Sequence, residues 1–185
     1  MLESPVNMAK AQTANKPVKI VAYGSPGSGK TTLVHAIDPE CRLVGSTETG
    51  ISRLCSTEGM FPTYVPFDLG IVNAGIRKVY VYGAPGNSRL KIAMSIISAD
   101  MDVGLIIVDA TRGITVYEKH IMESLKASKT PFIVLANKMD MPEASIDLVL
   151  KGLDDDVPLL PLSAKDGYGL DMLWNAIQNM IGIKV

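Results

Sequence analysis

The chain has 185 residues, which is room for one ordinary α/β domain and too little for two full ones. Hydrophobic residues make up 47% of the chain and charged residues 20%, so it can bury a core, and wholesale disorder is excluded. Its net charge of −1 provides no global positive field, so we expect no binding of nucleic acid.

The N-terminal residues carry no periodic pattern. Residues 1–17 are polar, so we expect a flexible extension followed by a single domain over residues 18–185. No run approaches the ~18 apolar residues of a membrane span, and we expect neither a signal peptide nor lipidation at either end. Its two cysteines are too few for a disulfide framework. These features favour a cytoplasmic protein without a membrane anchor in its sequence.

From Val18 onward, apolar runs of strand length alternate with segments of helical period, a pattern typical of βαβ units. Strands are predicted at Val18–Tyr23, Val65–Val72, Arg77–Tyr82, Val103–Asp109, Phe132–Ala136 and Leu159–Leu162. Helices are predicted at Gly29–Ile37, Ser88–Ser98, Thr115–Ser128, Ser145–Gly152 and Leu170–Ile181. Only residues 73–75 separate the second and third strands, so this pair must be antiparallel, whereas the others need crossovers. The prediction is an α/β fold with a six-stranded mixed sheet, one antiparallel strand and about five helices.

Directly after the first predicted strand, residues 24–31 read GSPGSGKT and match the phosphate-loop pattern G-x-x-x-x-G-K-[ST]. Glycines let the backbone wrap a diphosphate, the following helix directs free N–H groups at it, and Lys30 adds a cation. We expect Thr31 to ligate Mg²⁺. The candidate binding residues of this segment are Gly24, Gly27, Ser28, Gly29, Lys30, Thr31 and Thr32.

Two later segments favour guanine as the base. Residues 137–140 read NKMD at the end of a predicted strand, where open α/β sheets bind ligands. The Asp140 carboxylate can accept hydrogen bonds from N1–H and N2–H of guanine, a pair that adenine lacks. Lys138 can cover the base, Asn137 can brace the loops, and the Ala164 N–H of the segment Ser163-Ala164-Lys165 can meet guanine O6.

These three segments resemble those of the small, Ras-like GTPase superfamily, and the resemblance covers nearly all of residues 18–182. It implies a three-layer phosphate-loop NTPase fold and a switch that binds GTP or GDP with Mg²⁺. In that family a switch threonine also ligates Mg²⁺; Thr63 is the best match here, with Thr57, Thr49 and Thr47 as competitors.

The family's D-x-x-G element is altered in this chain, which reads GAPGN at residues 83–87. Gly83 replaces the aspartate that anchors Mg²⁺ from its outer shell, and such anchors are worth ~10 to 100-fold in affinity or activity. Gly86 keeps a backbone N–H for the γ-phosphate, and Asn87 is shorter than the glutamine that orients the attacking water. The resemblance implies Asn87, Gly86 and Lys30 as the catalytic residues, with slow intrinsic hydrolysis and activation by a partner.

Gly83, together with residues 64–70 (YVPFDLG), is most similar to a prokaryotic branch of small GTPases associated with roadblock-type regulators. That branch includes GTPases of multicomponent signalling systems and is related to the polarity switch of gliding bacteria. The resemblance implies a roadblock-family protein, or another protein regulator or effector, as the partner.

Several alternatives stay open at this point. Asp109 ends an apolar strand and is either a metal-anchoring acid or an acceptor for N–H groups in the next turn. Asp68 has a simple interpretation as a solvated strand residue. Besides a GTPase, the chain is compatible with a nucleotide-binding scaffold of negligible turnover and, less well, with a phosphotransferase, since no arginine-rich lid segment follows the core.

Overall fold

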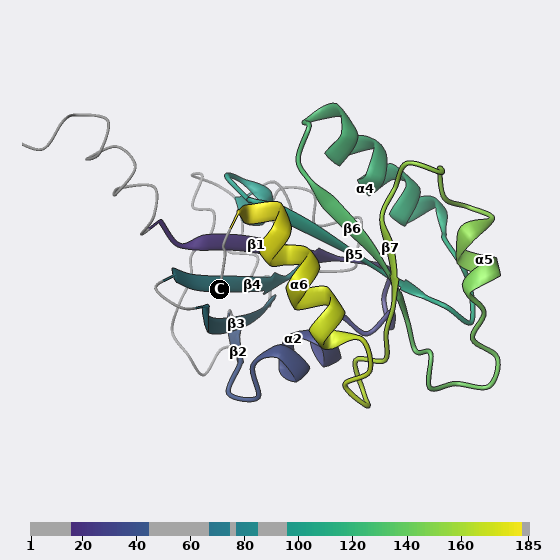
Figure 1. Ribbon diagram of the computed structural model, residues 1–185, viewed down its shortest axis with the longest axis horizontal. Helices are drawn as coiled ribbons and strands as arrows, with labels where there is room; N and C mark the ends of the chain where they lie inside the picture. Colours follow the sequence, from purple (N-terminus) through teal and green to yellow (C-terminus); the bar gives the residue numbers. More distant parts are fainter. Residues whose placement is uncertain (1–15, 45–66, 75–76, 85–95, 183–185) are drawn as a thin grey trace, which may run out of the picture.

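The computed structural model describes residues 16–44, 67–74, 77–84 and 96–182. Their strands form one sheet in the order β2-β3-β4-β1-β5-β6-β7 (Figure 1). Strand β3 runs antiparallel to both of its neighbours, and the other neighbouring pairs are parallel. The predicted α/β fold with one antiparallel strand is therefore confirmed.

Three parallel strands form the centre of the sheet: β1 (Val18–Tyr23), β5 (Val103–Asp109) and β6 (Phe132–Asn137). Every residue of β6 is buried, as are all but one residue of β1 and of β5. Strands covered on both faces need apolar side chains at successive positions, which is why their sequences read as unbroken apolar runs. The predicted bounds of β1 and β5 match the observed ones.

The antiparallel half of the sheet contains β3 (Phe67–Ala74) and β4 (Arg77–Gly83). Ala74 pairs with Arg77 at the end of the ladder, so the predicted hairpin is confirmed. A strand absent from the prediction, β2 (Arg42–Val44), pairs with residues 67–69 of β3 and adds a seventh strand at the edge. At the opposite edge lies the short strand β7 (Leu159–Pro161).

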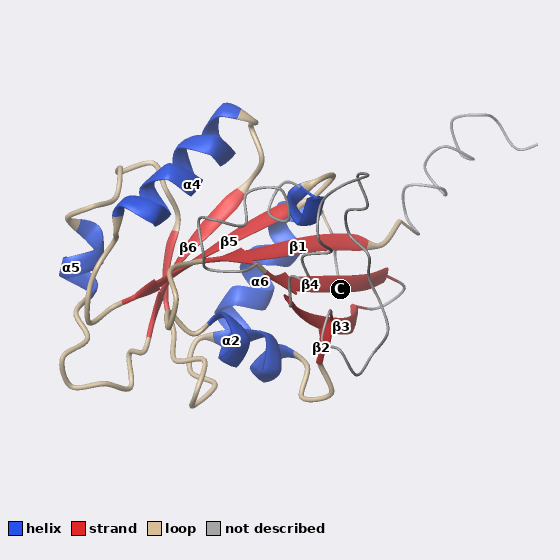
Figure 2. Cartoon of the chain, turned by 180° about the vertical axis from the view of Figure 1, so that it is seen from behind, coloured by secondary structure: helices blue, strands red, loops and turns tan. Residues whose placement is uncertain are grey.

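Helices cover both faces of the sheet (Figure 2). Helices α2 (Lys30–Ile37) and α6 (Leu170–Ile181) pack on one face, and α4 (Val116–Ala127) and α5 (Ile146–Leu150) pack on the other. Side chains of β1 alternate between the two layers, because successive strand residues point to opposite faces. Ile20 joins the cluster of α2 and α6, and Val21 joins that of α4 and α5.

Four of the predicted helices are thus found with each end within two residues of its expected position. Of the predicted helix at 88–98, the described residues 96–98 are helical, and the rest lies outside the described residues. Residues 1–15 of the predicted extension also lie outside them. No helix in the described ranges is both long and apolar enough to cross a membrane.

Gly104 of β5 lets α4 approach the sheet, and its replacement tests the packing of this layer. A Cβ atom at position 104 would lie 2.8 Å from Leu125 Cδ1 and 3.3 Å from Phe132 Cβ. Overpacking costs ~1 to 3 kcal/mol, more than the ~0.4 to 1 kcal/mol that Gly→Ala gains through the unfolded chain. We expect Gly104→Ala to lower the free energy of unfolding in urea by about 1 kcal/mol or more. Asn179→Ala, on the exposed side of α6, is the control and should change it by less than ~0.5 kcal/mol. Unchanged or higher stability of Gly104→Ala would contradict the packing described.

Candidate functional site

The C-terminal ends of β1, β5, β6 and β7 point the same way, because these strands are parallel neighbours. The loops that follow them therefore meet at one edge of the sheet, where parallel α/β proteins bind ligands. The loop after β1 carries the phosphate-loop motif, the loop after β6 carries NKMD, and the loop after β7 carries Ser163 to Lys165. The fold thus brings together the three segments that the sequence singled out.

The phosphate loop ends in a glycine that the backbone requires. Gly29 is the N-cap of α2 with φ +102°, a left-handed conformation that residues with a Cβ rarely adopt. A Cβ here would also collide with the side-chain amide of Asn137. The loop therefore delivers the first turn of α2, with its free N–H groups, to the edge of the sheet.

Lys30 is held against the loop to which it belongs. Its Nζ donates to the carbonyl oxygen of Gly24 over 2.7 Å and to that of Ser25 over 2.9 Å. Burial lowers the pKa of Lys30, whereas the nearby carboxylates of Glu118 and Asp68 act to raise it. A partly buried ammonium at a ring of backbone groups can bind an anion such as a phosphate.

Asp68 occupies the space that the altered D-x-x-G element leaves. It lies directly opposite Gly83 in the β3–β4 ladder, and opposite residues project from the same face of a sheet. A Cβ at position 83 would lie 3.0 Å from Asp68 Oδ2. The same Oδ2 accepts a hydrogen bond of 2.6 Å from the hydroxyl of Thr31.

The interpretation of Asp68 as a solvated strand residue is therefore wrong. The residue is only 8% exposed and its carboxylate contacts the phosphate loop. Gly83 carries no carboxylate, but β3 supplies one in the position that a side chain on β4 would reach. The chain thus retains an acidic group beside Thr31.

Asn137, 2% exposed at the end of β6, joins the loops. Its Nδ2 donates to the carbonyl oxygen of Ser28 over 2.8 Å, and its Oδ1 accepts from the Ala164 N–H over 2.9 Å. The bracing function predicted for Asn137 corresponds to these contacts. The Ala164 N–H, which the sequence assigned to guanine O6, donates to Asn137 in this structure.

An ion pair and two hydrogen bonds fix Asp109 beside the NKMD segment. Lys138 Nζ lies 2.6 Å from Asp109 Oδ2, and Thr111 donates to Asp109 Oδ1 through its N–H and its hydroxyl. Burial raises the pKa of Asp109, but the hydrogen bonds from Lys138 and Thr111 outweigh it and hold the pKa below its ordinary value. Asp109 Oδ1 thus accepts from Thr111 in the following turn, as the interpretation of Asp109 as an acceptor for that turn predicts.

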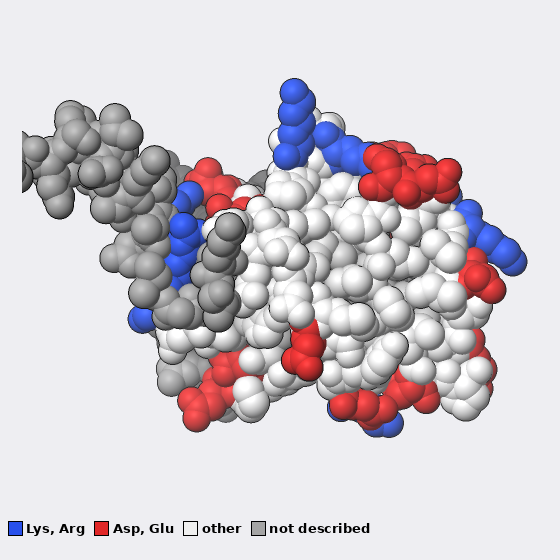
Figure 3. Space-filling model, in the orientation of Figure 1, with Lys and Arg blue, Asp and Glu red and all other residues white. Residues whose placement is uncertain are grey.

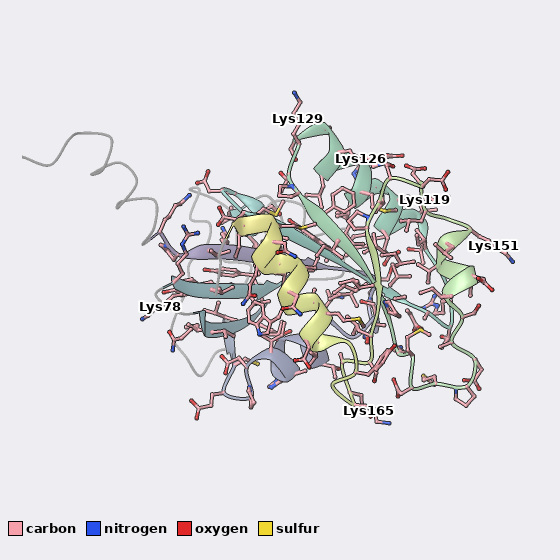
Figure 4. All side chains as sticks on the ribbon, viewed as in Figure 1. Lys78, Lys119, Lys126, Lys129, Lys151 and Lys165 are labelled. Carbon is pink, nitrogen blue, oxygen red and sulfur yellow. The ribbon has the colours of Figure 1, made fainter. Side chains whose placement is uncertain are left out.

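Asp140 is positioned by the loop after β7. The Ser163 hydroxyl donates to Asp140 Oδ1 over 2.8 Å, and Lys165 Nζ lies 3.8 Å from Oδ2. The hydrogen bond from Ser163, assisted by the charge of Lys165, lowers the pKa of Asp140 and keeps it ionised. Lys165 itself projects outward from this loop (Figure 4).

A cavity of about 350 Å³ lies between these segments. Its lining residues are Gly29, Thr32, Asn137, Lys138, Asp140, Met141, Ala164 and Lys165. All except Met141 were candidates from the sequence. The cavity joins the end of the phosphate loop to the carboxylate of Asp140, so a ligand with an anionic end and a hydrogen-bonding ring fits its chemistry.

Some predicted site residues cannot be placed. Thr63, its competitors Thr47, Thr49 and Thr57, and the catalytic candidates Gly86 and Asn87 lie outside the described residues. Within the described ranges, no group of three or more His, Cys, Asp or Glu side chains could hold a metal ion by itself. Two acidic residues that contact the phosphate loop were not among the predicted site residues: Asp68, interpreted as a solvated strand residue, and Glu118.

A phosphate loop after β1, an NKMD segment after β6 and a cavity between them define the chain as a GTP-binding domain of the phosphate-loop NTPase class. The family model of the elongation factor Tu GTP binding domain matches residues 75–182, more than half of the chain. The chain belongs to this family.

Known relatives agree with this assignment. The chain is 30% identical over 181 residues to the GTPase Der of Lawsonia intracellularis (strain PHE/MN1-00), covering 94% of this chain and 40% of that protein. Among solved structures, elongation factor SelB of Methanococcus maripaludis with the GTP analogue GppNHp matches with TM-score 0.66 at 22% identity, covering 92% of this chain and 35% of SelB. Aquifex aeolicus Era bound to GDP and AlF₄⁻ matches with TM-score 0.64 at 22% identity, covering 89% and 57%. The chain thus spans 40% of the length of this curated relative.

Removal of the Asn137 amide should loosen the site from within. In Asn137→Ala the buried N–H of Ala164 and the carbonyl of Ser28 lose their partner, and an unsatisfied buried group costs ~1 to 3 kcal/mol. We expect a loss of about that size in the urea unfolding free energy of the nucleotide-free protein. Lys165→Ala, at a side chain that is 77% exposed, is the control and should cost less than ~0.5 kcal/mol. Equal stability of the two variants would show that Asn137 does not brace the loops.

Proposed function

We propose that this protein is a guanine-nucleotide switch that binds GTP or GDP with Mg²⁺ and hydrolyses GTP slowly, with a partner protein completing the catalytic site. The observation that carries the proposal is the cavity that both Asp140 and the end of the phosphate loop line, with Asn137 bonded to that loop. We also propose that residues 18–185 form a single domain of this kind.

The base would be read by the ionised carboxylate of Asp140. Ser163 and Lys165 keep this group charged and oriented, so it can accept two hydrogen bonds from N1–H and N2–H of guanine. Adenine presents an acceptor at N1 and would leave the carboxylate unsatisfied. Lys138 lies in the same cavity wall, with its ammonium fixed by Asp109, so that its alkyl stem can cover the ring.

The phosphates would be bound by the first turn of α2 and Lys30, and the metal by the hydroxyl of Thr31. Mg²⁺ prefers oxygen ligands and usually keeps several waters, which fits a hydroxyl with a carboxylate 2.6 Å behind it. Thr31 would be a direct ligand, Thr63 a second one, and Asp68 would accept hydrogen bonds from the metal's waters. When bound, the ion would neutralise charge on the β and γ phosphates.

Slow hydrolysis follows from the water-positioning residue. Asp68 would supply the carboxylate that Gly83 lacks, so the proposed metal site would keep an acidic group beside Thr31. Asn87 remains one methylene shorter than glutamine, and it is the residue that would hold the attacking water poorly. A scaffold of negligible turnover is the second candidate function, and the same Asn87 supports it.

A partner would supply the missing catalytic group. The resemblance of residues 64–70 and of Gly83 to the roadblock-associated branch supports a roadblock-family protein, and signalling as the biological setting. Such a partner could contribute a cation to the developing charge of the transition state, as activators of GTPases do.

Base selection can be inverted at Asp140. Asp140→Asn replaces an acceptor by an amide that can face the O2 of xanthine, so the variant should lose GTP and gain XTP affinity. We expect a loss of GTP affinity of about 100-fold or more, because a bidentate charged pair becomes a mismatch. Fluorescence titration with labelled GDP and XDP measures this, and Asp166→Asn, on the loop after Lys165, is the matched control. Unchanged preference for GDP in Asp140→Asn would exclude the assignment.

The proposal that Asp68 replaces the aspartate missing at position 83 can be tested by exchanging the two residues. Asp68→Gly should raise the Mg²⁺ concentration needed for half-maximal GDP retention by ~10 to 100-fold, as expected for an outer-shell anchor. Gly83→Asp alone should also impair the site, because the new Cβ lies 3.0 Å from Asp68 Oδ2 and two carboxylates would crowd together.

The double variant Asp68→Gly/Gly83→Asp should recover most of the Mg²⁺ response, since it restores one carboxylate to the same space. Asn179→Ala, on the exposed side of α6, serves as a control for handling and folding. If the double variant is no better than the worse single variant, the two positions do not share one function.

A further inference from the structure

Glu118 is a fully buried carboxylate, 1% exposed, in the first turn of α4. One of its oxygens, Oε2, accepts hydrogen bonds from the N–H and the hydroxyl of Thr115 and completes the capping box of the helix. The other oxygen, Oε1, turns to the phosphate loop and accepts from the N–H and the hydroxyl of Ser25, each over 2.6 Å. Helix capping explains the first oxygen only.

The carboxylate is ionised in this setting. Burial raises the pKa of Glu118, but the hydrogen bonds from Ser25 and Thr115 outweigh burial and hold the pKa below its ordinary value. Hydrogen bonds to a charged acceptor are stronger than those between neutral groups. The hydrogen bonds from Ser25 to Glu118 therefore hold the phosphate loop firmly to α4.

Ser25 also contacts Lys30, the lysine of the phosphate loop. Ser25 donates its N–H to Glu118, and its own carbonyl oxygen accepts from Lys30 Nζ over 2.9 Å. The negative charge of Glu118 also acts to raise the pKa of Lys30, against the effect of burial. Ser25 thus contacts both Glu118, in the first turn of α4, and the ammonium group of Lys30.

We propose that Glu118 is a positioning residue that holds the phosphate loop in its nucleotide-binding shape and couples the first turn of α4 to nucleotide affinity. The inference rests on the proposed function. It adds that the position of α4 sets the rate at which nucleotide is released. Val116, the neighbouring residue in that turn, is 85% exposed, so a partner protein can reach the turn from solvent.

Dissociation of a fluorescent GDP analogue from the full chain, chased with excess GDP in Mg²⁺, tests the proposal. Glu118→Gln keeps the shape of the side chain but loses its charge and turns an N–H donor toward Ser25 or Thr115. We expect this variant to raise the dissociation rate about tenfold or more, and Ser25→Ala to raise it by about threefold. Because both changes weaken the same contact between Glu118 and Ser25, the double variant should release GDP no faster than Glu118→Gln alone.

Thr115→Ala is the control for helix capping: it removes the hydroxyl that contacts Oε2 and, over 3.1 Å, the Ser25 hydroxyl, but it leaves the N–H of Ser25 on Oε1. It should lower the melting temperature and change the dissociation rate by less than about twofold. Equal rate increases in Thr115→Ala and Glu118→Gln, or additive effects of Ser25→Ala and Glu118→Gln, would overturn the proposal by reducing Glu118 to a helix cap. If Glu118→Gln does not fold, an unchanged rate in Ser25→Ala overturns it equally. Failure of the wild type to bind GDP would instead refute the proposed function.

Discussion

The amide of Asn137 is the contact on which the site depends. It is buried at the end of a central strand, where it connects the phosphate loop to the segment after β7 with both of its polar atoms satisfied. Buried polar groups with all partners in place fix a unique arrangement, whereas a missing partner is costly. The sheet supplies the frame: β1, β5 and β6 run parallel, so the loops that Asn137 joins begin at the same edge. The face over α6 and β7 shows a broad uncharged area, and most of its Lys, Arg, Asp and Glu side chains lie near the rim (Figure 3).

Around this frame an acidic side chain reaches the phosphate loop from a strand other than β4. The acidic group beside Thr31 comes from β3, because Asp68 and Gly83 are directly opposed across an antiparallel pair. Glycine at position 83 leaves room for this carboxylate, since a Cβ there would lie 3.0 Å from Asp68 Oδ2. Glu118 also reaches the phosphate loop from a distant element: it caps α4 and accepts a hydrogen bond from Ser25.

The sequence predicted the features that local pattern determines. Apolar runs located β1 and β5 to the residue, and the glycine spacing with its flanking strand and helix located the phosphate loop. The sequence did not predict the features that depend on pairing between residues far apart in the chain. The three residues of β2 have too short a run to be recognised, and their strand exists only because β3 offers an edge. Asp68 was misjudged because its neighbour at position 83 follows from strand register, which composition and spacing do not contain. Thr115 and Glu118 form a readable capping box, but the contact with Ser25 spans 93 residues.

The most direct test of a guanine-nucleotide site is to identify what the protein binds. Purified protein is incubated with equal concentrations of GDP and ADP in Mg²⁺, freed of unbound nucleotide, denatured, and its released nucleotides are separated by ion-exchange chromatography. The cavity formed by Asp140, Asn137 and the phosphate loop predicts GDP, or co-purified GTP, at close to one molecule per chain with little ADP. Recovery of ADP in comparable amount, or of no nucleotide at all, would contradict the account.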